Sequence, residues 1–176
     1  MYTIYKVIAI LFLLFILFIS LIGFFSKRDT TLKYATVTES PSPVVWQYIT
    51  DLEKIVQWRQ KIDKMEIQNM KEMNNDAVIK YYQNGMEYQE RVIEWIPGKK
   101  VTFQRIDDKS YPIFSNIITS LEINALIGGS TEINIIFKYK LQTFFARIYD
   151  TLYLKHYFKD QYEKELSDLK DTLEKV

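Results

Sequence analysis

The sequence predicts an α+β protein in which a curved antiparallel sheet packs around one long C-terminal helix, preceded by a single transmembrane helix. Three observations support this fold class. Residues 7–25 carry no charge, residues 63–141 form short β-branched runs with turn residues between them, and residues 144–173 place apolar side chains at helical spacing. At 176 residues, the chain is long enough for one domain with a sizeable core.

The N-terminal apolar segment is long enough to cross a bilayer. Its 19 uncharged residues, 7–25, span about 28 Å as a helix, close to the roughly 30 Å hydrocarbon core. A buried core helix is rarely apolar on every face. A cleaved signal peptide has a shorter apolar region with small residues before the cut, unlike Leu21–Phe25. We therefore predict a retained, single-pass membrane anchor.

Charged residues around the anchor indicate its orientation. Lys27, Arg28 and Lys33 follow the apolar segment, whereas Lys6 and the amino group precede it. The positive-inside rule then mildly favours a cytoplasmic side for the folded domain. We divide the chain into an anchor at 1–26, a linker at 27–31 and a folded domain at 32–176.

The folded domain is expected to begin with a strand and two short helices. Residues 32–39 alternate and are β-branched, which is typical of a strand. Ser40 is placed to cap the first helix, whose first turn accepts Pro41 or Pro43. Asp51 restarts the helical pattern as a second N-cap, so we predict two helices with a kink between them.

Three hairpins are predicted between these short helices and the C-terminal helix. Asn74–Asn75, Pro97–Gly98 and Gly128–Ser130 each separate two strand-like runs. The resulting sheet has one apolar face, and the C-terminal helix is the element large enough to cover it. The six predicted strands are 63–70, 76–83, 86–95, 100–107, 115–127 and 131–141.

The two halves of the C-terminal helix have different patterns. Residues 144–158 carry aromatic side chains nearly all round, so we expect this half to be buried more widely than the rest. The second half has one apolar stripe, made of Phe158, Tyr162, Leu166, Leu169 and Leu173.

Turn positions predict which residues face each other across the hairpins. A turn at Pro97–Gly98 places Val92 opposite Phe103 and Glu90 opposite Arg105, all on the concave face. An unpaired charge there would be costly, so a Glu90–Arg105 ion pair is expected. It is either a half-solvated pair at the sheet rim or a polar group inside an apolar pocket that orients a ligand's headgroup. A loop at 128–130 would place Leu121 opposite Phe137 and Ile123 opposite Ile135.

Composition excludes several kinds of function. The 23 basic and 22 acidic residues are nearly balanced, so nothing indicates a nucleic-acid partner. The chain has no cysteine, and its one histidine, His156, makes a zinc site or a histidine triad unfavoured. We predict a surface position for His156, no catalytic residue, no metal and no cofactor. The 13 tyrosines and 11 phenylalanines suit a large core or an apolar cavity.

Several motifs, in this order and spacing, resemble the START-like SRPBCC superfamily, in particular its polyketide cyclase/dehydrase and lipid transport branch. The resemblance covers residues 33–174 and implies a helix-grip fold, with an apolar cavity between sheet and helix. It also implies that Trp46 and Trp58 are packing anchors. The motifs are Glu39-Ser40-Pro41 before Val45-Trp46, then Thr50-Asp51 and Trp58, Glu90 with Glu94 and Pro97, Gly128-Gly129-Ser130-Thr131, and Leu166 with Leu169-Lys170.

This resemblance implies a membrane-anchored protein that binds a hydrophobic small molecule, such as a lipid, a quinone or a polyketide-like compound. One alternative is a cyclase or dehydratase acting on a similar ligand. Another is a non-catalytic interaction or chaperone-like module whose cavity is packed shut. The sequence specifies neither the ligand nor the oligomeric state. The predicted cavity-lining residues are Trp58, Tyr88, Glu90, Val92, Phe103, Arg105, Leu121, Ile123, Ile135, Phe137, Tyr149 and Leu152.

Overall fold

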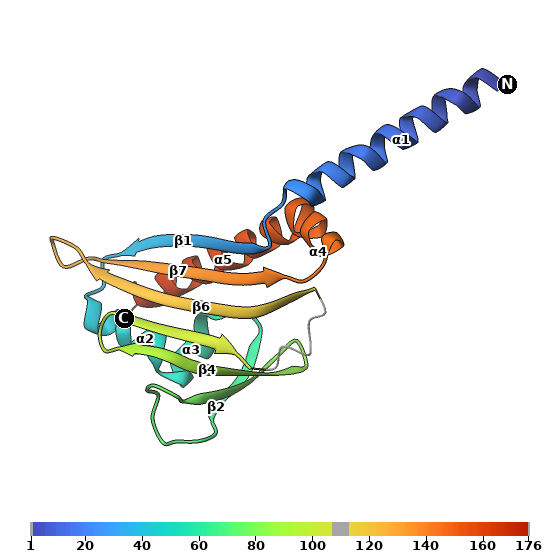
Figure 1. The fold of residues 1–176 in the computed structure, drawn as a ribbon. Coiled ribbons are helices and arrows are strands. Elements are labelled where there is room, and N and C mark those ends of the chain that lie inside the picture. Colours follow the sequence, from blue (N-terminus) through green and yellow to red (C-terminus); the bar gives the residue numbers. More distant parts are fainter. Residues whose placement is uncertain (1, 107–112, 176) are drawn as a thin grey trace.

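The computed structural model describes residues 2–106 and 113–175. Within them, seven strands form one antiparallel sheet in the order β1-β7-β6-β5-β4-β3-β2. The sheet curves around α5, while α2 and α3 pack against α5 and the sheet on the same side (Figure 1). This is the α+β architecture that the sequence predicts. The strands are β1 (Asp29–Thr38), β2 (Ile62–Ile67), β3 (Val78–Gln83), β4 (Met86–Ile96), β5 (Lys100–Arg105), β6 (Phe114–Ala125) and β7 (Thr131–Leu141).

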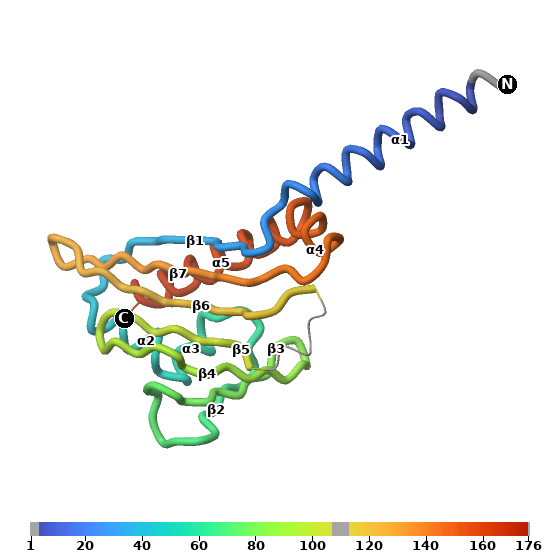
Figure 2. Tube along the Cα trace, viewed as in Figure 1, coloured from blue at the N-terminus to red at the C-terminus, as the bar shows by residue number. Residues whose placement is uncertain are grey.

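The helices divide into a projecting N-terminal one, whose last turn contacts α4, and a group that lies against the sheet. α1 projects away from the rest of the molecule (Figure 2). Within the described residues, it is the one helix long and apolar enough to cross a membrane. The helices are α1 (Tyr2–Phe25), α2 (Ser42–Thr50), α3 (Leu52–Trp58), α4 (Phe144–Tyr149), a π-helical turn η2 (Asp150–Leu154) and α5 (Lys155–Leu173).

The helix caps agree with the sequence at α3 and differ at α2. Asp51 Oδ1 accepts a hydrogen bond from the Glu53 amide at 3.0 Å, which confirms the predicted N-cap. The N-cap of α2 is Pro41, with no side-chain hydrogen bond, so the predicted cap at Ser40 is wrong. Ser40 Oγ instead donates to the Leu173 carbonyl at 3.2 Å, because the end of β1 reaches the last turn of α5.

The β4–β5 hairpin has the predicted register at its centre. Glu90 pairs with Arg105, and Val92 pairs with Phe103. A bulge between Val92 and Glu94 shifts the register by one residue toward the turn, where Ile96 pairs with Lys100. The predicted strand 100–107 ends at Arg105, and its last residue lies outside the described part of the chain.

The β6–β7 register corrects the prediction. Leu121 pairs with Ile135 and Ile123 with Ile133, two residues away from the expected partners. The loop is longer than predicted, because the Leu126 amide donates to the Ser130 carbonyl at 2.9 Å and residues 126–130 all lie beyond the last pair. A shift of two residues keeps the same side chains on the same face, so the predicted concave set survives the error.

The first half of the C-terminal helical segment is more exposed than predicted. Phe145 is 77% exposed, Leu152 54% and Tyr153 50%. The expectation of wide burial is therefore wrong, because α1 and the sheet cover α4 and η2 in part and leave one side uncovered. The stripe on α5 follows the prediction more closely: Tyr162, Leu166, Leu169 and Leu173 are buried, and Phe158 is half-buried.

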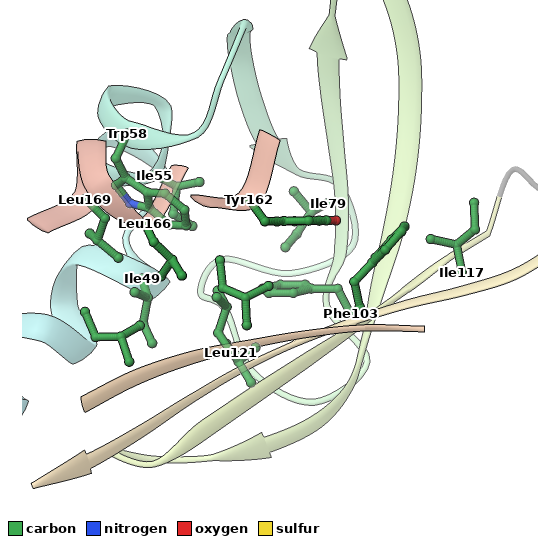
Figure 3. Packing of buried hydrophobic residues seen from close by; sticks show 14 of the residues in the cluster. Ile49, Ile55, Trp58, Ile79, Phe103, Ile117, Leu121, Tyr162, Leu166 and Leu169 are labelled. Carbon is green, nitrogen blue, oxygen red and sulfur yellow. The ribbon is translucent and has the colours of Figure 1, made fainter. Parts of the chain in front are cut away.

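A large part of the core lies where α2, α3 and α5 meet the sheet. Ile49, Ile55, Trp58, Leu166 and Leu169 gather there (Figure 3). Trp58 is 3% exposed, and its indole Nε1 donates to the Tyr48 carbonyl at 3.0 Å. Trp46 packs edge-on against Trp95 with ring centroids 5.0 Å apart. Both tryptophans therefore act as packing anchors, as the resemblance implies.

Candidate functional site: a cavity with a buried polar cluster

A cavity of about 560 Å³ lies between the concave face of the sheet and the helices η2 and α5. Its size is within the range of roughly 300–1,000 Å³ that is usual for small-molecule sites. One part of its lining is polar and comes from β3 to β5 and the end of α3. The other part is apolar and comes from β6, β7, the end of α4, η2 and the first turn of α5, while the following turns of α5 contribute the polar residues Asp160, Gln161, Lys164 and Glu165. The cavity therefore has two chemically different ends.

Glu90 is the centre of the polar end. Its carboxylate is 3% exposed and accepts two hydrogen bonds from Arg59, each at 3.4 Å. Tyr81 Oη donates to Glu90 Oε1 at 2.8 Å. Arg105 Nη2 lies 3.8 Å from the same carboxylate oxygen and donates to Tyr81 Oη at 2.6 Å. Two guanidinium groups and one phenol thus surround one buried carboxylate.

Aromatic rings support both arginines of this cluster. Arg59 Cζ lies 5.1 Å from the centroid of the Tyr81 ring, and Arg105 Cζ lies 4.5 Å from the centroid of the Tyr88 ring. Such cation–π contacts are stronger where water is excluded. The Arg105 side chain is 10% exposed, so the Glu90–Arg105 pair is buried rather than half-solvated.

The charges in the cluster shift each other's pKa. Burial alone would raise the pKa of Glu90, but Arg59 and Arg105 more than offset this effect, so the pKa lies below its ordinary value. Burial disfavours the charge on Arg59, yet Glu90 raises the pKa of its guanidinium on balance. Burial, reinforced by Glu90, raises the pKa of Tyr81. At neutral pH the cluster therefore holds charged groups together with a neutral phenol donor.

Backbone geometry explains how these side chains converge. Glu90 and Arg105 face each other across β4 and β5, and alternation puts Tyr88 on the same face as Glu90. Arg59 is the first residue after α3. Its extended backbone, at φ −75° and ψ 125°, ends the helix and brings the side chain to the cavity wall.

Glu165 on α5 is a second buried carboxyl group beside the cavity. It is 2% exposed, and Gln161 Nε2 donates to its Oε1 at 3.1 Å. Burial raises the pKa of Glu165, and the nearby Arg59 lowers it only in part. The pKa values of Glu90 and Glu165 are thus shifted in opposite directions, because only Glu90 of these two lies directly between two guanidinium groups.

Sequence reasoning missed three of these residues, Arg59, Tyr81 and Glu165. Glu165 lies three residues after Tyr162 and four before Leu169, so it sits inside the apolar stripe. An acidic residue inside an apolar stripe is the signal by which the sequence could have identified Glu165 as a buried polar residue. Arg59 follows Trp58 directly, and no periodic pattern marks it.

The apolar end of the cavity is lined mainly by aromatic rings and isoleucines. Phe137 and Phe158 have ring centroids 4.8 Å apart, and those of Phe114 and Phe158 are 6.2 Å apart. Ile113 and Ile117 line the same wall. This end can accommodate an aliphatic chain or fused rings without leaving a buried polar group unpaired.

The structure divides the twelve predicted lining residues into three groups. Five line the large cavity: Tyr88, Glu90, Arg105, Phe137 and Tyr149. Four surround a separate void of only about 20 Å³ near α3: Trp58, Phe103, Leu121 and Ile135. The remaining three lie outside both spaces: Val92 and Ile123 are in the packed core, and Leu152 is 54% exposed on η2.

The described residues contain no group of histidine, cysteine or acidic side chains arranged to hold a metal ion. His156 is exposed on α5, which agrees with the predicted surface position. What the site can do chemically is hold an apolar molecule and satisfy one of its polar groups.

Comparisons with known proteins agree with this geometry. Residues 34–174 match the family described as polyketide cyclase/dehydrase and lipid transport, and the chain belongs to this family. No curated protein sequence matches the chain at a significant level.

Solved structures show the same helix-grip fold. The Zhui aromatase/cyclase from Streptomyces sp. R1128 is 13% identical, with a TM-score of 0.66 over 83% of this chain and 94% of that one. The di-domain ARO/CYC BexL from the BE-7585A biosynthetic pathway is 11% identical, with a TM-score of 0.68 over 82% of this chain and 46% of that one. Ara h 8.0201 is 10% identical, with a TM-score of 0.66 over 84% and 99%. Identities this low support the fold alone.

Proposed function

We propose that this member of the family is a membrane-anchored binding protein for a hydrophobic small molecule that carries one polar group. A lipid, a quinone or a polyketide-like compound has this character. The apolar part of the ligand lies against Phe114, Phe137 and Phe158, and its polar group lies near Arg105 and Glu90. The observation that carries the proposal is the cavity of about 560 Å³ with charged groups at one end and aromatic rings at the other.

The aromatic content of the chain does not close this cavity. That volume is large enough for a molecule of lipid or polyketide size, whereas the void near α3 holds at most one water. A module whose interior is packed shut therefore fits the structure less well than a binding protein does.

Native mass spectrometry of the full-length chain tests the proposal. We expect one small molecule to stay bound after the detergent micelle is removed, and organic extraction identifies its class. Arg105→Leu removes a cluster member and should lower the bound fraction at least tenfold. Arg91→Leu makes the same change at an exposed position of β4 and should leave it unchanged. A protein without bound molecules that also ignores added phospholipids and quinones contradicts the proposal, as does equal occupancy in both variants.

We also propose that α1 is a retained single-pass anchor and that the folded domain lies on the cytoplasmic side. Lys27 and Arg28 follow α1 directly, which supports this orientation. The chain has no cysteine, so Glu72→Cys, in an exposed loop, would carry the one thiol. A membrane-impermeant maleimide should label it only after the cells are permeabilised. Labelling of intact cells, or a mature protein without residues 1–25, would contradict the assignment.

A second candidate function is proton-transfer catalysis of the cyclase or dehydratase type on a similar ligand. The observation that favours it is Glu165, a buried carboxyl that lines the cavity and whose pKa is raised by burial, as is usual for a general acid. Turnover of a model polyketone by the wild type, and its loss in Glu165→Gln with ligand binding intact, would support an enzyme. Binding without turnover would favour the binding protein over the enzyme.

A further inference from the structure

Five exposed aromatic and aliphatic side chains form one face of α4, η2 and the first turn of α5. We call this the aromatic face, and it consists of Phe145, Tyr149, Leu152, Tyr153 and Tyr157. We propose that the aromatic face lies in the interface of the bilayer that α1 crosses, and that the apolar end of the cavity adjoins this interface. The inference rests on the proposed anchor and ligand-binding function.

The length of α1 sets the depth of its last turn. The candidate membrane span, Ile4–Phe25, has 22 residues and is about 33 Å long, close to the roughly 30 Å hydrocarbon core. When this segment spans the bilayer, Gly23 and Ser26 lie at the edge of the hydrocarbon core. Any element packed against them is held at the same depth.

The last turn of α1 is packed closely against α4 (Figure 1). A Cβ atom at Gly23 would lie 2.5 Å from Phe144 Cζ and 2.9 Å from Ile148 Cγ1, so the two helices approach as closely as only glycine permits. Ser26 Oγ lies 2.8 Å from Thr151 Oγ1 and shares a hydrogen bond with it. These contacts hold α4 and η2 at the depth of the membrane edge.

The side chains on the aromatic face are those that interfaces favour. Tyr149, Tyr153 and Tyr157 stack in a row, with successive centroids 5.3 and 6.1 Å apart. Phe145 and Leu152 flank them and are 77% and 54% exposed. Tyrosine places its apolar ring in the bilayer and its hydroxyl in the headgroup layer, and large exposed apolar patches are uncommon on surfaces that meet only water.

A buried polar contact keeps this face turned outward. Asp150, at the start of η2, is 1% exposed and accepts hydrogen bonds from Tyr139 and, at 3.2 Å, from Thr30 Oγ1. Lys155 Nζ lies 3.4 Å from the same carboxylate. These hydrogen bonds hold Asp150 against β1 and β7 and so fix which side of η2 faces the sheet. Tyr149 and Tyr153 therefore remain on the outer side, with their rings exposed.

The aromatic face continues into the cavity. Tyr149 and Tyr157 line the cavity although they are 44% and 47% exposed, so they form part of its rim. Behind them lie Leu154 and Phe158 of the apolar wall, whereas Glu90 is at the other end. An apolar ligand can therefore pass from the bilayer to the apolar wall without crossing water.

Single cysteines carrying a nitroxide label test this inference, since the chain has no cysteine of its own. The full-length protein is placed in vesicles of phosphatidylcholine and phosphatidylglycerol, and collision rates with oxygen and with a water-soluble nickel complex are measured. The labelled positions are Phe12 in α1, Phe145 and Tyr153 on the aromatic face, and Ile127. Ile127 is a matched apolar control, fully exposed in the loop between β6 and β7. This loop lies at the far end of the sheet from α1 (Figure 1).

We expect Phe12, Phe145 and Tyr153 to show an oxygen-to-nickel ratio several-fold above that of Ile127. Gly23→Leu should lower the ratio at Tyr153 and leave that at Phe12 unchanged. If Phe145 and Tyr153 match Ile127 while Phe12 reports lipid, the anchor stands and the inference is overturned. If the label at Phe12 also reports an aqueous environment, the anchor proposal is wrong, and the inference that rests on it is wrong too.

Discussion

The two ends of the interior are built from similar strands yet differ in how they are filled. Near α2 and α3, residues such as Ile49, Ile133 and Leu169 are fully buried, and the space left over is about 20 Å³. Toward η2 and the start of α5, the same sheet leaves about 560 Å³. Ile117, on the wall of the large cavity, lies well apart from the packed group in Figure 3.

The difference shows what keeps an interior open. At the packed end, branched and aromatic side chains interlock at close to crystal density. At the other end, the inward positions include Glu90 and Arg105, which need hydrogen-bond partners and cannot interlock with apolar neighbours. The charged residues satisfy one another on one side of the space, and the rest stays available to a ligand.

The largest effect should come from breaking the polar cluster. Glu90→Leu leaves Arg59 and Arg105 without their buried carboxylate, and we expect the free energy of unfolding to fall by roughly 3–5 kcal/mol. Glu87→Leu, on the same strand, breaks a solvent-screened pair with Lys80 and should cost much less than Glu90→Leu. Urea unfolding of the full chain in detergent measures both. Equal losses would mean that the cluster is not energetically distinct from a surface pair.

Matched truncations should separate the two ends more finely. Ile133→Ala at the packed end should cost about 2–5 kcal/mol, because it creates a new cavity. Ile117→Ala enlarges a space that already exists, so its cost should be at the lower limit of that range, about 2 kcal/mol. The same unfolding experiment compares them. A larger loss at Ile117 would indicate that the large cavity is packed in solution.

The two buried carboxyls should give opposite pH dependences. The folded pKa of Glu90 is lowered, so its contribution to stability is present above the unfolded pKa and is lost as the pH falls through the folded pKa. The folded pKa of Glu165 is raised, so the folded state keeps its proton longer and loses stability as the pH rises from the unfolded to the folded pKa.

Glu165→Gln removes the ionisable carboxyl and with it the loss of stability that Glu165 causes as the pH rises. The variant should therefore gain stability relative to the wild type as the pH rises from 4.5 through the folded pKa. Unfolding measured at several pH values checks this sign. A difference between variant and wild type that does not change with pH would show that Glu165 titrates normally.

The smallest loss in the free energy of unfolding should come from a change in α3, the helix that links the two ends of the interior. α3 carries Trp58 to the packed end and leads directly to Arg59 at the cavity. Asp51→Ala removes its cap and should cost about 1 kcal/mol, whereas Asp51→Asn should cost a few tenths. Equal losses in these two variants would indicate that the hydrogen bond to the Glu53 amide contributes nothing.

The sequence predicted the sheet, the helix order and the central ion pair because each depends on a local pattern. Alternation with a period of two assigns faces, and it does so even where the register is wrong by two residues, as at Leu121 and Ile123. The bulge after Val92 and the long loop at 126–130 have no comparable signal.

The site was predicted only in part, since volume is a property of the assembled fold. Trp58 and Phe103 were expected beside the ligand, but they lie at the void near α3 because neighbouring side chains fill the space around them. The exposure of Tyr153 depends on which side of η2 the sheet covers. Arg59 joins the cluster because α3 ends there, at a position set by tertiary packing.

The central claim is that the large cavity holds the ligand, and a matched pair of cavity-filling variants tests it most directly. Ile117→Trp places an indole in the cavity, while Ile93→Trp adds the same bulk at an exposed position of β4. Both keep α1, so detergent or lipid held by that helix does not distinguish the two variants. After thermal melting confirms that both fold, native mass spectrometry should show the bound molecule in wild type and Ile93→Trp and its loss in Ile117→Trp. Equal retention in all three would contradict the account.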